Sequence, residues 1–164
     1  MPNWIKGTMK LRGKRKELYR FFKEGLEASS WAGEVNKLED QVKGGCEDGM
    51  LWFDFKDEPH IIGTRRAFII DDCVEVHFDN DEEECVACVD VKQAWAFYAG
   101  NETKDLQNWK DISNKFNVDI RLYGVESGMC FTQEIIIVRG KRPIVNELQY
   151  EDWDWECPFP RMGG

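Results

Sequence analysis

Four side chains near the middle of the chain could together bind a metal ion. Cys85 and Cys88 form a C-x-x-C pair, and Cys73 and His77 lie shortly before them. Zinc takes four such ligands in a tetrahedron, and a C-x-x-C turn supplies two thiolates at once. Within a strand, however, the C-x-x-C thiols point to opposite faces. Because free cysteine is among the most buried residue types, we expect core cysteines and no cofactor, with structural zinc as the alternative.

The residue types that carry covalent or acid-base catalysis are sparse. The only histidines are His60 and His77, and no serine stands in a recognisable nucleophile motif. Neither common pattern of Gly-rich phosphate loop occurs. Carboxylates are plentiful, but a run of charges is usually a solvated face. We therefore expect a protein that binds a partner and has no catalytic activity.

Negative charge is concentrated in one segment. Between Asp71 and Asp90 the chain has nine carboxylates and no Lys or Arg, and the formal net charge of the whole chain is −9. Such a field repels nucleic acid and attracts basic protein surfaces. We predict that this acidic hairpin mimics the phosphate backbone and inhibits a host protein with a basic groove, such as a defence or nucleic-acid-handling enzyme. The expected contact residues are Asp79, Asp81, Glu82, Glu83 and Glu84, with the aromatic anchors Trp153 and Trp155.

Positive charge is concentrated at the N-terminus. The first 23 residues contain eight Lys or Arg and one Glu. Their spacing could follow the phosphates of a nucleic acid, so the alternative function is a nucleic-acid or nucleotide-binding module. The sequence pI of about 4.8 opposes this function, and we expect these basic residues to pair internally with the acidic hairpin. The residues of the alternative site are Lys6, Lys10 and Arg12 on a strand, followed by Lys14, Arg15 and Lys16.

Hydrophobic periodicity predicts the elements that position these residues. Alternation from Ile5 to Arg12 indicates a strand with one wet face, and Leu18, Phe21, Phe22 and Leu26 have helical spacing. Hairpin strands follow within residues 50–91, a second helix spans Leu106 to Phe116, and two further strands extend to Val138. Residues 43–49 read as a loop. This order predicts a ferredoxin-like β-α-β-β-α-β fold of the α+β class, with two helices on one face of an antiparallel sheet and an added C-terminal strand or tail.

We expect one domain over residues 1–146, with the acidic hairpin inserted around residues 67–91. Residues 147–164 mix acids with aromatics and are predicted to form a tail, either extended or packed back on the domain. The N-terminus has no apolar leader, and no apolar run approaches the roughly 20 residues of a membrane span. We therefore expect a protein of the cytosol that does not bind membranes.

Several short motifs resemble the YubB/Api92-like family of phages and plasmids, which has a ferredoxin-like domain. The motifs are Met1-Pro2-Asn3-Trp4 before the first strand, Ala94-Trp95, Trp109, and Tyr123 with Glu126-x-Gly128. They lie within residues 1–11 and 91–140, and the acidic middle of the chain has no counterpart. The resemblance implies a bacteriophage or mobile-element accessory protein acting in the host bacterial cytosol. It carries over no catalytic residue.

Overall fold

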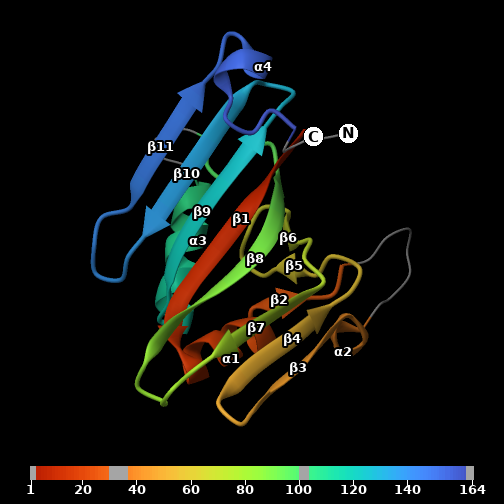
Figure 1. Ribbon diagram of the computed structural model, residues 1–164, viewed down its shortest axis with the longest axis vertical. Helices are drawn as coiled ribbons and strands as arrows, with labels where there is room; N and C mark the ends of the chain where they lie inside the picture. Colours follow the sequence, from red (N-terminus) through yellow and green to blue (C-terminus); the bar gives the residue numbers. More distant parts are fainter. Residues whose placement is uncertain (1–2, 30–36, 100–103, 162–164) are drawn as a thin grey trace.

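The computed structural model describes residues 3–29, 37–99 and 104–161, which form two antiparallel sheets and four helices (Figure 1). The large sheet has the strand order β11-β10-β9-β1-β8-β6-β5-β2, and the small sheet has the order β3-β4-β7. The strands of the large sheet are β1 (Trp4–Lys14), β2 (Leu26–Glu27), β5 (His60–Ile61), β6 (Ala67–Ile69), β8 (Glu84–Ala94), β9 (Asp119–Glu126), β10 (Phe131–Ile137) and β11 (Ile144–Gln149). Those of the small sheet are β3 (Val42–Glu47), β4 (Met50–Phe55) and β7 (Cys73–His77). The helices are α1 (Arg15–Glu24), α2 (Leu38–Gln41), α3 (Lys104–Phe116) and α4 (Trp153–Glu156).

Strand β1 lies inside the large sheet, between β8 and β9. Its alternating sequence explains this position, since Ile5, Met9 and Leu11 are fully buried on one face while the intervening residues are polar. The alternation predicted this strand, and the structure confirms it. Because β1 pairs along both edges, the polar residues of its other face are held in fixed register with β8 and β9.

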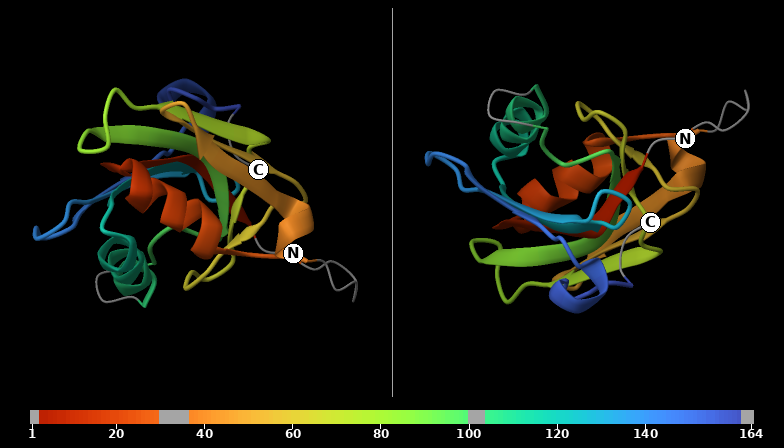
Figure 2. Two further views of the ribbon diagram at one scale, coloured as in Figure 1. Left: turned by 90° about the horizontal axis from the view of Figure 1, so that it is seen from below. Right: turned by 90° about the horizontal axis from the view of Figure 1, so that it is seen from above.

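Helices α1 and α3 cover the buried face of β1, and the short helix α4 lies on the opposite side of the large sheet (Figure 2). Phe21 of α1 meets Phe116 of α3 edge to face, with ring centroids 5.5 Å apart. Both helices were predicted from their apolar spacing. Helix α1 nevertheless ends at Glu24, with Gly25 as its C-cap, and Leu26 belongs to strand β2.

The small sheet packs on the side of α1 that the large sheet leaves free. Phe22 of α1 contacts the rings of Phe53 and Phe55 in β4, with centroid distances of 5.3 and 5.7 Å. All three aromatic side chains are almost completely buried. Helix α1 therefore contributes to the core beneath both sheets.

The predicted ferredoxin-like α+β class is wrong, because strands dominate the structure and form a large and a small sheet. Residues 43–49 were read as a loop, yet they supply β3 and the turn into β4. Asp48 and Gly49 have φ of 48° and 77°, which is the left-handed pair of a two-residue hairpin turn. With β3 in place, β4 and β7 form a separate sheet around α1 instead of joining β1.

The segment 147–164 does not form an extended tail in its described part. Gln149 is the last residue of β11, α4 follows, and Cys157 is buried. Tyr150 donates its backbone N–H to the carbonyl of Cys130 at 2.8 Å, so this segment packs back on its own domain. Met1 and Pro2 of the family resemblance lie outside the described residues. Among the described helices, none combines the length and apolar character needed to cross a bilayer.

Candidate functional site

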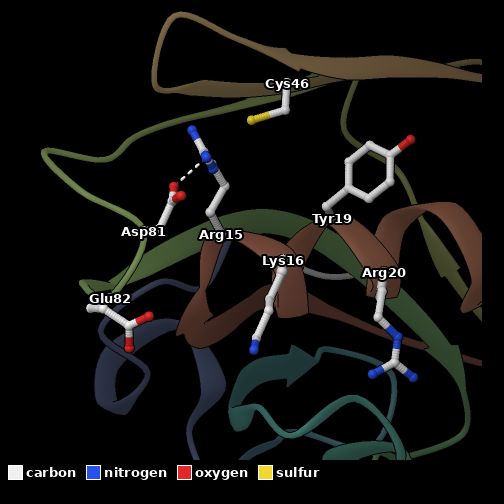
Figure 3. A pocket seen from close by; sticks show the side chains of 7 residues that line it. All are labelled: Arg15, Lys16, Tyr19, Arg20, Cys46, Asp81 and Glu82. Atoms are coloured by element: carbon white, nitrogen blue, oxygen red, sulfur yellow. Dashed lines mark ion pairs between the residues drawn. The ribbon is translucent and has the colours of Figure 1, made fainter.

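A cleft of about 690 Å³ lies at the start of α1 (Figure 3). It lies between α1, the β3-β4 hairpin and the acidic loop of residues 79–84, which joins β7 to β8. The cleft is lined by Arg15, Lys16, Tyr19, Arg20, Cys46, Asp81 and Glu82. The helix places its basic side chains here because its apolar residues face the core. The cleft thus brings together members of both charged sets that the sequence singled out.

The acidic loop is bound to the basic start of α1 by two ion pairs. Lys14 pairs with Glu82, and Arg15 pairs with Asp81. The hydrogen bond and the charge of the partner raise the pKa of Lys14 and lower the pKa of Glu82. This confirms the expected internal pairing. Because both carboxylates are largely exposed, each pair contributes little to stability, but together they reduce the free negative charge of the loop.

Other side chains of the acidic loop hold its own backbone. Asn80 accepts hydrogen bonds from the backbone N–H groups of Glu82 and Glu83, each at 3.0 Å. Glu83 in turn accepts the N–H of Asp79 at 2.8 Å. The residues predicted to contact a partner therefore also shape this turn, and their contact with a host protein stays a prediction.

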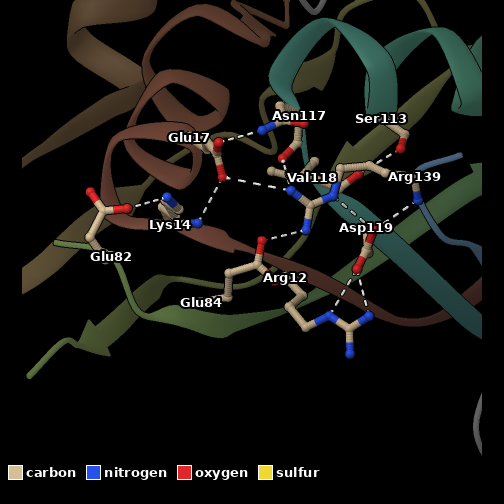
Figure 4. A network of polar contacts seen from close by, with 10 residues as sticks. All are labelled: Arg12, Lys14, Glu17, Glu82, Glu84, Ser113, Asn117, Val118, Asp119 and Arg139. Carbon is tan, nitrogen blue, oxygen red and sulfur yellow. Dashed lines mark hydrogen bonds and ion pairs between the residues drawn. The ribbon is translucent and has the colours of Figure 1, made fainter. Parts of the chain in front are cut away.

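Arg139 links the end of the loop to the interior (Figure 4). Its guanidinium contacts Glu84 at 2.5 Å, Asp119 at 3.0 Å and Glu17 at 4.0 Å. Glu17 is buried and accepts hydrogen bonds from the N–H of Lys14 and the side chain of Asn117. Because each of these carboxylates has hydrogen-bond or ion-pair partners within the protein, the cluster has a structural role and is not an acid-base pair. We call this cluster of Arg139, Glu17, Glu84 and Asp119 the joint.

The electrostatics of Asp119 follow from this joint. Burial alone would raise the pKa of Asp119, but hydrogen bonds from the side chain and backbone of Arg139, and from the side chain of Arg12, outweigh burial and lower that pKa. Asp119 and Glu84 together raise the pKa of Arg139, chiefly through the hydrogen bond of Arg139 to Asp119. Arg12 approaches Asp119 at 2.8 Å through Nε. Asp119 and Arg139 are therefore charged in the folded protein at neutral pH, because the pKa of each is shifted in favour of its charged form.

A second basic surface occupies the face of the large sheet opposite α1 and α3, which we call the open face. Lys10 of β1 lies directly across from Arg121 of β9 in the strand register. Two hollows of about 280 and 290 Å³ adjoin there and share both side chains. The floor and rim are further formed by Thr8, Tyr123, Glu134, Arg12, Val86 and Ile136.

The cations of the open face differ in how far they are neutralised. Arg121 pairs with Glu134 at 2.5 Å, and Arg12 pairs with Asp119. In the described part of the chain, no carboxylate lies within ion-pair distance of Lys6 or Lys10. The residues of the predicted nucleic-acid site are thus divided. Lys6, Lys10 and Arg12 lie on the open face, Arg15 and Lys16 line the cleft, and Lys14 pairs with Glu82 of the cleft lining.

The four proposed zinc ligands do not converge. Cys85 and Cys88 project to opposite sides of β8, and Cys85 donates its thiol hydrogen to the carbonyl of His77 at 3.3 Å. No group of three or more metal-ligating side chains with suitable geometry occurs within residues 3–29, 37–99 and 104–161. The expectation of core cysteines fails for Cys73 and Cys88, which are exposed, while all six cysteines are free thiols.

The two predicted aromatic anchors have different surroundings. Trp153 packs against the ring of Tyr150 and donates its indole N–H to the carbonyl of Pro160 at 2.9 Å. Trp155 is 87% exposed. Of the two, Trp155 alone is free for contact with a partner.

The sequence analysis assigned no functional role to Arg121, Tyr123, Glu134 or Arg139. The alternation of β9 marked Arg121 and Tyr123 as solvent-facing, but nothing local to the sequence paired β9 with β1. Comparison with family models, curated proteins and solved structures finds no match for this chain. The resemblance to the YubB/Api92-like family, and the phage origin that it implies, therefore stay predictions.

Proposed function

We propose that the protein is a binding module that takes single-stranded nucleic acid on the open face of the large sheet. The observation that carries this proposal is the direct opposition of Lys10 and Arg121 across β1 and β9. Like charges directly opposite one another destabilise a sheet. Glu134 already pairs with Arg121, whereas Lys10 has no carboxylate partner in the described residues, so Lys10 is the charge that an anionic ligand would neutralise.

The shape of the open face supports a single strand over a duplex. A duplex is read by an element that projects into a groove, whereas a single strand is bound along a surface that offers cations for phosphates and flat side chains for bases. Lys6 and Lys10 lie along β1, and the half-buried ring of Tyr123 lies on the neighbouring strand at the edge of one hollow. Phosphates would contact the lysines, and a base would stack near Tyr123.

The proposal is tested with a labelled single-stranded oligonucleotide and fluorescence anisotropy at low salt. We expect binding that weakens as salt rises, because each phosphate contact releases counterions. Lys10→Glu should weaken binding by about tenfold or more, which corresponds to roughly 1.4 kcal/mol. Lys10 is preferred to Arg12 for this test because Arg12 also holds Asp119, so its replacement would disturb the joint around Arg139.

Lys43→Glu is the matched control, since Lys43 is exposed on β3 of the small sheet and the change in charge is identical. We expect this variant to bind like the wild type, apart from a small effect of net charge. An equal loss of oligonucleotide affinity in both variants would show that binding depends only on the net charge of the protein, and would contradict a site at Lys10. No binding by the wild type at low salt would contradict the proposal.

One observation favours the second candidate, an inhibitor that docks on a basic host protein. Trp155 is almost fully exposed and stands between Asp154 and Glu156, and aromatic residues of this kind anchor interfaces. The acidic loop lies at the other end of the molecule from α4 (Figure 1). Asp79 and Glu83 take part in neither of its ion pairs with Lys14 and Arg15, so these two carboxylates of the loop are not neutralised by those pairs. An affinity purification at low salt that recovers no basic protein, or recovers it equally with Trp155→Ala, would contradict this candidate.

A further inference from the structure

Strand β11 forms one border of the large sheet, with β10 on one side and no strand on the other in the described structure (Figure 1). Five of its six residues are exposed. The exposed residues include two large apolar side chains, Ile144 at 53% and Leu148 at 62%. An exposed edge of this length presents unpaired backbone N–H and C=O groups and readily pairs with another strand.

The other borders of the sheets lack these properties. Strand β2 has only two residues, and β3 contains Gly44 and Gly45 between the charged residues Lys43 and Glu47. Strand β7, the other border of the small sheet, buries both of its valines and carries the exposed Glu75 at its centre. Charges and glycines are the devices by which proteins prevent pairing at an edge. Strand β11 has a single charged residue, Glu147. It is therefore the edge that is suited to pairing.

We propose that β11 pairs with β11 of a second copy of this chain, antiparallel and with Asn146 at the two-fold axis. Charge selects the antiparallel direction: Lys141 and Arg142 precede the strand, whereas Glu151 and Asp152 follow it. Antiparallel pairing sets the basic end of one copy beside the acidic end of the other. Parallel pairing would set like charges together.

Side-chain pairing selects the register. Residues directly opposite one another must point to the same face of the sheet. In a symmetric antiparallel pair this requires that one residue lies opposite its own copy, so the register is defined by the residue at the two-fold axis. With Asn146 opposite Asn146, Ile144 of each copy lies opposite Leu148 of the other, so both exposed apolar side chains are covered. The register centred on Glu147 would oppose two carboxylates and leave Leu148 against Asn146, so it is disfavoured.

The two-fold axis of this dimer is perpendicular to the sheet. The two large sheets then form one continuous sheet, and the two open faces with Lys10 and Arg121 point to the same side. The contact uses one strand from each copy, so the interface is small and we expect a dimer that dissociates on dilution. This inference stands independently of the nucleic-acid proposal, because it rests on β11 alone.

Sedimentation velocity of the full chain over a range of concentrations tests the association. We expect the mass to rise towards twice that of one chain, and Leu148→Lys to remain a monomer. Leu148 is mostly exposed, so the variant should keep the circular dichroism spectrum of the wild type. A wild type that stays monomeric throughout the range overturns the proposal.

Disulfide trapping tests the register, in a background where the exposed Cys46, Cys73 and Cys88 are replaced by Ser. Asn146→Cys should cross-link with itself, and Ile144→Cys should cross-link with Leu148→Cys when the two chains are mixed, since opposed side chains lie close enough for a disulfide. Ile144→Cys alone should not cross-link. If it cross-links with itself as efficiently as the mixture does, the pairing is parallel and the proposal is wrong.

Discussion

At the scale of single residues, Asp119 shows how charge is used inside this protein. It is buried at the start of β9, yet it is held by Arg12 and Arg139 together with the backbone N–H of Arg139 at 2.9 Å. Removing one partner from a buried ionic group leaves an uncompensated charge, which costs more than the pair itself contributes. Asp119 is therefore a determinant of stability that no pattern in the sequence singled out.

The lowered pKa of Asp119 predicts a dependence of stability on pH. The folded chain binds this proton less tightly than the unfolded chain, whose carboxyl has the ordinary pKa of 3.8. The stabilisation is therefore complete above that pKa and is lost as the pH falls through the lower pKa of the folded state. Asp119→Asn should reduce the free energy of unfolding by about 1–3 kcal/mol at neutral pH and flatten its decrease in acid. Urea unfolding at several pH values measures both effects.

Asp54→Asn is the control for this measurement, because Asp54 is exposed on β4 and has no ion pair in the described part of the chain. We expect its unfolding to follow the wild type at every pH. If the unfolding free energy of Asp119→Asn falls in acid as steeply as that of the wild type, Asp119 does not cause the pH dependence and the prediction is wrong.

At the scale of elements, β1 and β9 leave no room for a side chain where Gly7 of β1 pairs with Gly124 of β9. A Cβ atom added to Gly7 would lie 1.9 Å from the carbonyl oxygen of Tyr123, so the backbones must separate to accept any side chain. We expect Gly7→Ala to cost about 3 kcal/mol or more, because overpacking against backbone cannot be relieved by a rotamer change. Urea unfolding is the measurement.

Gly45→Ala is a matched change within a strand, since its added Cβ would meet nothing nearer than Trp52 at 3.8 Å. We expect it to change the free energy of unfolding by less than about 1 kcal/mol. If the two variants lose similar amounts of unfolding free energy, the close approach of β1 and β9 at Gly7 does not affect stability and the prediction is wrong.

The elements also show what the sequence could predict. Strand β1 and helix α3 followed from periodicity, and the pairing of the acidic loop with the first basic residues followed from opposite charge. Strand β3 was missed because its glycines resemble a loop, and only its pairing with β4 makes it a strand. The opposition of Lys10 and Arg121 depends on the register of residues far apart in the chain, which local patterns do not contain.

At the scale of the whole molecule, α1 connects the cores of the two sheets. Phe22 is fully buried and lies against Phe21, Phe53 and Phe55. We predict that Phe22→Ala reduces the free energy of unfolding by about 3–5 kcal/mol and lowers protection of both sheets together. Hydrogen exchange of backbone amides in β1 and β4 measures this, and loss of protection confined to β4 would contradict a single cooperative unit.

The position of β1 has a consequence for the newly made chain. Its two neighbours, β8 and β9, begin only at Glu84 and Asp119, so a ribosome releases this strand with its apolar face long before either partner exists. Folding must then wait for contacts of high sequence separation, which are slow to form and leave hydrophobic segments exposed meanwhile. We accordingly expect a chaperone to bind the segment Trp4–Lys14 during synthesis.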